Sequence, residues 1–169
     1  QALPAGGTLF ASPHGTIPVS RFTGEPGVDR YDRDEHSFGY RFEHAPGGNW
    51  ALRQNFEYHA TGLDNFNVFS NSIQADQRTI NRAFFVSIGE VEGLKIDNQA
   101  EFAFGTGPLG HTLLVGLDHQ RNEVRSRQFF GAAPTLDVFD PVYGAAVPAP
   151  PIFLDDETLQ RQTGLYVQD

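Results

Sequence analysis

The sequence contains neither cysteine nor methionine. Without cysteine there is no disulfide framework and no thiolate metal site, so redox chemistry says nothing about the cellular compartment. There is also no initiator methionine, and no basic start followed by an apolar run that would mark a signal peptide. We therefore expect the chain to be an excised or processed piece of a longer protein.

Basic charge and long apolar runs are also scarce. The 12 lysines and arginines face 21 aspartates and glutamates, which gives a net charge of −9. Nucleic-acid binding relies on clustered Lys and Arg, so this balance disfavours a nucleic-acid partner. No run approaches the roughly 18 apolar residues that a membrane helix requires. That excludes helical spans only, because barrel strands of about 9 to 11 alternating residues carry a much weaker signature.

What the sequence does contain is alternation of apolar and polar residues, which is typical of β-strands. The stretch HSFGYRFEH places Phe38, Tyr40 and Phe42 on one side of an extended chain and Arg41 and Glu43 on the other. Either face could point inward: in a soluble sheet the aromatics would form a core, and in a membrane barrel they would contact lipid.

Similar alternation recurs along the chain. Strands are predicted over 35–45, 50–61, 94–104, 112–127 and 158–169. Gln54 is a polar interruption on the apolar side of the second strand. Residues 1–34 are rich in Gly and Pro and predict a long loop or weak hairpin. Residues 78–91 have mixed strand character, which we interpret as strand protruding beyond the main sheet.

The predicted connections alternate in length. They are short at 46–49 and 105–111, and long at 62–91 and 129–157. Successive connections of antiparallel strands lie at opposite ends of a sheet, so the long loops would gather at one end, as in an outer-membrane barrel. Five aromatic residues of these loops are candidate ligand contacts, although packing within the loops explains them equally well: Phe66, Phe69, Phe129, Phe130 and Tyr143.

The charged residues of the predicted strands share the face opposite the aromatics. They are Arg41, Glu43, Arg53, Glu57, Lys95, Asp97 and Glu101. In a closed membrane sheet this face must line the lumen, because Arg or Lys at the lipid midplane costs roughly 2–4 kcal/mol. A soluble β-sandwich would instead pack the same aromatics into its core, and the pattern alone leaves both open.

No motif indicates catalysis or a resident metal. GTGPLG matches the dinucleotide fingerprint G-x-G-x-x-G, but a strand follows it where that site needs a helix N-terminus, so we interpret it as a hairpin turn. Neither G-x-S-x-G nor H-E-x-x-H occurs. Glu57 and His59 share a strand face, at a spacing too common to indicate metal ligands. We predict no catalytic residues, no metal site and no cofactor.

Four stretches carry a family resemblance. They are GEPGVDRYDRDEHSFGYRFEHAPGGNWALRQNFEY, FAFGTGPLGHTLLVGLDHQR, DVFDPVYGAAVPAP and RQTGLYVQD. In this order they resemble successive barrel strands of the TonB-dependent ferric-siderophore receptors of Gram-negative outer membranes. The ferrichrome and hydroxamate-type branch fits best, and the likeness extends over almost the whole chain from about residue 20.

This resemblance implies an all-β fold, in which about five antiparallel strands form a segment of a 22-stranded transmembrane barrel. Its short turns would be periplasmic and its long loops extracellular. It also implies energy-coupled uptake of a ferric siderophore, which is the transported ligand, with TonB, ExbB, ExbD and outer-membrane lipid as partners. No TonB box or plug is recognised, so residues 1–169 are expected to be a partial barrel domain. A soluble β-sandwich ligand-binding module and a passive outer-membrane porin are the alternatives.

Overall fold

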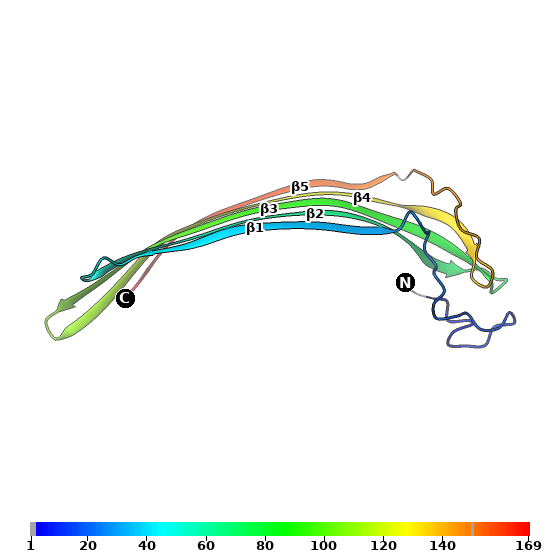
Figure 1. Cartoon of the computed structure of the whole chain (residues 1–169), viewed down its shortest axis with the longest axis horizontal. Helices are drawn as coiled ribbons and strands as arrows, with labels where there is room; N and C mark the ends of the chain where they lie inside the picture. Colours follow the sequence, from blue (N-terminus) through cyan, green and yellow to red (C-terminus); the bar gives the residue numbers. More distant parts are fainter. Residues whose placement is uncertain (1–2, 150) are drawn as a thin grey trace. The chain divides into compact units, whose positions relative to one another are not determined.

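The computed structural model describes residues 3–149 and 151–169. Its strands are β1 (Arg30–His44), β2 (Trp50–Ile73), β3 (Thr79–Thr106), β4 (Leu109–Asp137) and β5 (Ile152–Gln168). They form one five-stranded sheet in chain order, with β1 and β5 at its edges (Figure 1). In the described part of the chain, no helix is long and apolar enough to cross a membrane.

Neighbouring strands are antiparallel. Arg30, at the start of β1, contacts Asp64 in the second half of β2. Tyr40, near the end of β1, contacts Gln54, near the start of β2. The expected all-β sheet of five antiparallel strands is therefore confirmed. Among the described residues the strands form a single sheet, where a β-sandwich would need two packed sheets.

The strands are longer than the sequence predicts, and the connections are shorter. Residues 62–73 are expected as loop but continue β2, so the β2–β3 connection is only residues 74–78. The loop expected from residue 129 begins only after β4 ends at Asp137. The prediction of two long loops is thus wrong for the first; among the connections between the described strands, only that between β4 and β5 is long. The interpretation of residues 78–91 as strand is correct, since they belong to β3 from Thr79 onward.

Burial on both faces explains why alternation fails in the first part of β3. β1 begins at Arg30, so β2 has no β1 partner past this end. There the Val68 N–H of β2 donates instead to the carboxylate of Asp29, the residue before β1, at 2.9 Å. The consecutive β3 residues 82–84 are all buried. A strand covered on both sides has no need for a polar face, so its sequence loses the period of two.

The chain divides into two compact units. Unit 1 comprises residues 1–33, 63–89 and 126–156. It contains two buried apolar clusters, one of Ile17, Ile80, Leu136 and Val138, the other of Val68, Phe84, Val86 and Ala133. Segment 3–29 is irregular apart from an isolated bridge, as the sequence predicts, and it contributes Ile17 to the first cluster.

Unit 2 comprises residues 34–62, 90–125 and 157–169. Many of its large apolar side chains are exposed, among them Phe38, Phe42, Phe102, Phe104 and Leu165. Burying such side chains is worth about 1.5–3 kcal/mol each. The described residues do not cover this apolar face, so we expect it to contact something else, such as lipid or another part of the protein.

Candidate functional site

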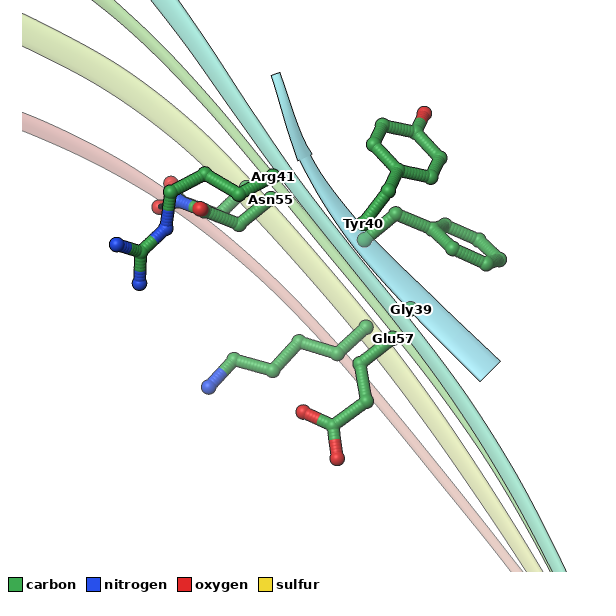
Figure 2. A pocket seen from close by; sticks show the side chains of 8 residues that line it. Gly39, Tyr40, Arg41, Asn55 and Glu57 are labelled. Atoms are coloured by element: carbon green, nitrogen blue, oxygen red, sulfur yellow. Dashed lines mark hydrogen bonds between the residues drawn. The ribbon is translucent and has the colours of Figure 1, made fainter. Parts of the chain in front are cut away.

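Unit 2 separates charged and aromatic side chains onto opposite faces. Figure 2 shows Arg41, Asn55 and Glu57 on one side of the strands and Tyr40 on the other. The Tyr40 ring stacks on Phe56, with ring centroids 5.4 Å apart. Because successive side chains of a strand point to opposite faces, the alternation in the sequence becomes two chemically different surfaces.

Three of the charged residues predicted for the lumen form one ion-pair group across β1, β2 and β3. Arg53 Nη1 lies 2.8 Å from Glu101 Oε2, and Arg53 Nε lies 3.6 Å from Glu43 Oε2. All three side chains keep substantial contact with solvent. Such exposed pairs contribute about 0–1 kcal/mol each, so the group shapes the electrostatics of the face more than its stability.

Asp97 gathers three hydrogen-bond donors on the same charged face. Asn55 Nδ2 lies 3.3 Å away, Gln99 Nε2 lies 2.8 Å away, and the Tyr166 hydroxyl donates at 2.8 Å. Tyr166 comes from β5 and its ring lies against Gly116 of β4, where a Cβ atom would collide with the ring. The glycine therefore lets Tyr166 reach past β4 to Asp97 on β3.

The remaining predicted lumen residues surround an open hollow of about 540 Å³. Arg41, Glu57 and Lys95 line it together with Asp97. Two cationic and two anionic side chains thus meet in one place. A surface with both signs of charge suits a polar partner or water, and it does not suit lipid.

The aromatic face carries a small polar network that sequence reasoning found only in part. The Tyr40 hydroxyl donates to Gln54 Oε1 at 2.5 Å, and Gln54 Nε2 donates to Asn98 Oδ1 at 2.6 Å. Gln54 was visible as a polar interruption, but Asn98 was missed. Only the pairing of β1, β2 and β3 shows that these uncharged groups satisfy one another.

The five candidate ligand aromatics lie in unit 1, but four of them are on strands where loops are predicted. Phe66 and Phe69 belong to β2, Phe129 and Phe130 belong to β4, and Tyr143 lies in the β4–β5 connection. The loop assignment is therefore wrong for all but Tyr143, because β2 and β4 extend further than their alternation shows. Whether these residues contact a ligand stays a prediction.

The contacts of these aromatics differ. Phe66 stacks on Phe84 with centroids 5.7 Å apart, and Phe129 packs against the same cluster. Phe130 is instead 47% exposed and lines a hollow of about 400 Å³ together with Asn81. Phe66 and Phe129 thus serve packing, whereas Phe130 is available to a ligand.

Unit 1 also holds a buried ion pair that the sequence does not reveal. Arg82 Nη2 lies 2.8 Å from Glu25 Oε2, and both side chains are almost fully buried. Arg82 also donates to the Gly24 carbonyl at 2.6 Å and to the Pro134 carbonyl at 2.7 Å. No local pattern predicts a partner 57 residues away.

Charged groups also organise the β2–β3 connection. The Thr79 hydroxyl donates to Asp76 at 2.6 Å, and the N–H groups of Thr79 and Arg78 add two further bonds. These bonds lower the pKa of Asp76 to about 2. Burial raises the pKa of Asp137, but its bonds from Arg78 and from nearby backbone N–H groups outweigh burial and lower it overall.

Comparison with known proteins identifies the family. The profile described as "TonB dependent receptor-like, beta-barrel" matches residues 2–169, and the chain belongs to this family. Over 169 residues it is 34% identical to the ferrioxamine B receptor of Salmonella typhimurium, covering 100% of this chain and 24% of that protein.

More distant relatives carry related names. The chain is 26% identical over 192 residues to the ferrichrome outer membrane transporter/phage receptor of Escherichia coli K12, covering 99% of this chain and 26% of that protein. It is 30% identical over 155 residues to a metal-pseudopaline receptor of Pseudomonas aeruginosa, covering 89% and 22%. The chain spans about a quarter of the length of these curated relatives. The predicted resemblance is confirmed, and the family match favours a receptor barrel over a porin or a sandwich.

Proposed function

We propose that this chain forms part of the wall of an outer-membrane receptor that imports ferric siderophores with energy supplied through TonB. The family match over residues 2–169 and the siderophore names of the relatives support this proposal. The structural observation that carries it is the separation of charged and aromatic side chains onto opposite faces of one open sheet in unit 2 (Figure 2).

In this proposal the aromatic face contacts lipid and the charged face lines the lumen. At the lipid midplane Arg41 and Lys95 would each cost roughly 2–4 kcal/mol, and Glu57 would cost less. The charged face is therefore stable only when it lines the lumen. β2, β3 and β4 have 24, 28 and 29 residues, far more than the about 9–11 needed to cross a bilayer. We therefore place the ends of these strands that adjoin the 74–78 and 138–151 connections, and the connections themselves, on the extracellular side.

The transported ligand is a ferric siderophore, and the hydroxamate type is favoured by the ferrioxamine and ferrichrome names of the relatives. It is cargo, neither bound permanently nor chemically converted, so the proposal assigns no catalytic residue. Phe130 and Tyr143 are its candidate contacts in this chain. TonB with ExbB and ExbD, and outer-membrane lipid, are the proposed partners.

Iron uptake in cells with and without TonB tests this function. The full-length gene is expressed in a Gram-negative host that lacks its own hydroxamate receptors, and the probe is ferric ferrioxamine B labelled with iron-55. We expect the probe to bind to both strains and to accumulate only where TonB is present. Equal accumulation in both strains would indicate a passive porin, and absence of binding to either would reject ferric ferrioxamine B as the ligand.

A further inference from the structure

The buried ion pair of unit 1 extends into the long β4–β5 connection. Glu25 Oε2 pairs with Arg82, and the other carboxylate oxygen, Oε1, accepts a hydrogen bond from the Gly144 N–H at 2.5 Å. Gly144 has a φ of +94°, a left-handed conformation that favours glycine. The Glu25 carboxylate therefore links segment 3–29 and β3 to the connection. The link is made at Gly144, whose left-handed backbone is one that glycine adopts readily.

The start of the connection is held by the Asp137 carboxylate, which accepts the Phe139 and Asp140 N–H groups, and by Arg21, which donates to the Phe139 carbonyl. Beyond Asp140 the described part of the connection has few bonds of its own. Within the described residues 138–149, the Val138 N–H alone donates a backbone–backbone hydrogen bond outside the strands. The Tyr143 hydroxyl donates to the Phe22 carbonyl at 2.7 Å, and the two rings are in contact with centroids 6.3 Å apart. The position of Tyr143 therefore depends on segment 3–29, in which Glu25 is a buried residue that bonds to the connection.

We propose that Glu25 is a positioning residue for siderophore binding, which holds residues 138–149 through Gly144 and so sets the place of Tyr143. This rests on the proposed function, in which Tyr143 contacts the ligand. Glu25 is 1% exposed and so does not touch a ligand itself. It acts through the loop, since a contact residue discriminates well only when the groups behind it lock its position.

Two double variants of the full-length receptor separate positioning from stability. Glu25→Gln with Arg82→Met removes both charges and keeps a side-chain carbonyl for the Gly144 N–H. Glu25→Met with Arg82→Met removes both charges and that acceptor as well. Replacing both members of a buried pair avoids leaving one charge alone in the interior. Asp64→Asn is the matched control, because it removes the exposed pair with Arg30 in the same unit.

Two readouts are taken on isolated outer membranes: the affinity for iron-55 ferric ferrioxamine B, and chymotrypsin cleavage after Tyr143. For the Met/Met variant we expect cleavage after Tyr143 and affinity weaker by about tenfold, the size of one lost hydrogen bond. Both double variants lose the Arg82 bonds to the Gly24 and Pro134 carbonyls, so the Gln/Met variant should show much less cleavage and tighter binding than the Met/Met variant. Asp64→Asn should resemble the wild type in both readouts. Equal behaviour of the two double variants would overturn the proposal.

A single substitution, Gly144→Ala, keeps the proposal testable if the double variants do not insert into the membrane. Gly144→Ala leaves the buried pair intact and strains the left-handed backbone, with no atom within 4 Å of the new Cβ. We expect the same cleavage and the same loss of affinity, and wild-type behaviour would contradict the role of the loop. If the wild type binds no ferric siderophore, the proposed function fails, while the cleavage readout still decides whether Glu25 fixes the connection.

Discussion

The Tyr40 hydroxyl of β1 donates a hydrogen bond to Gln54 Oε1 of β2, on the aromatic face of the sheet. Gln54 Nε2 in turn donates a hydrogen bond to Asn98 Oδ1 of β3 at 2.6 Å. A polar amide facing lipid is costly unless its hydrogen bonds are made within the protein. The chain of three uncharged side chains thus makes Gln54 compatible with a lipid-facing position.

Gln54→Leu should destabilise the barrel, although it makes the face more apolar. The substitution leaves Asn98 and the Tyr40 hydroxyl without their partner, which costs about 1–2 kcal/mol. Urea unfolding of the full-length receptor in lipid vesicles measures this. The double variant Gln54→Leu/Asn98→Leu should regain the part of the loss that is due to Asn98, because no unpaired amide is then left; the Tyr40 hydroxyl still lacks its partner. A double variant no more stable than the single one would show that the network is irrelevant.

An arginine at position 40 should strongly disfavour insertion. Tyr40→Arg places a cation on the face that we assign to lipid, at a cost of roughly 2–4 kcal/mol near the midplane. Ser37→Arg is the control, since Ser37 is on the charged face of the same strand. Heat-modifiable migration on gels reports the folded fraction, and equal folding of both variants would reverse the assignment of the faces.

Low pH should loosen the β2–β3 connection. Bonds from the Thr79 hydroxyl and from backbone N–H groups lower the pKa of Asp76 to about 2, from 3.8. A carboxyl whose pKa is lowered by folding adds stability above its unfolded pKa and loses it as pH falls through the folded value. We therefore expect faster amide exchange at Thr79 as pH falls from 3.8 to about 2. In Asp76→Ala the exchange, corrected for its intrinsic rate, should be fast at every pH; an unchanged rate in that variant would contradict the role of Asp76.

Alanine substitutions of Phe130 and Phe84 should have different effects, one on ligand binding and the other on stability. Phe84 is 1% exposed in the second apolar cluster, so Phe84→Ala should cost about 3–5 kcal/mol in stability. Phe130→Ala should leave the unfolding midpoint nearly unchanged and weaken binding of ferric ferrioxamine B. If Phe130→Ala binds like the wild type, Phe130 is not a ligand contact.

The sequence predicts the fold best where one face is apolar and the other polar. Phe38, Tyr40 and Phe42 alternate with charge and are correctly assigned to a strand. Residues 62–73 are not, because Val68 packs with Phe84 of β3 and Ala133 of β4, and these partners cannot be seen in the local pattern of β2.

Contacts between distant residues explain what the sequence could not show of the candidate site. The charged face followed from alternation, but the partners of its members depend on strand register, as for Tyr166 and Asp97. Glu25 and Arg82 lie in a loop and in a strand of mixed pattern, and nothing local to either residue indicates burial. A single sequence gives the faces of a strand, while the register decides which side chains meet.

The assignment of one face to lipid and the other to the lumen is tested most directly by cysteine labelling along β2. The chain has no cysteine of its own, so in a receptor freed of any others Leu52, Arg53, Asn55 and Phe56 are each replaced by cysteine. We expect a water-soluble maleimide to label positions 53 and 55, and a membrane-partitioning maleimide to label 52 and 56. Labelling of all four positions by the water-soluble reagent would contradict the account.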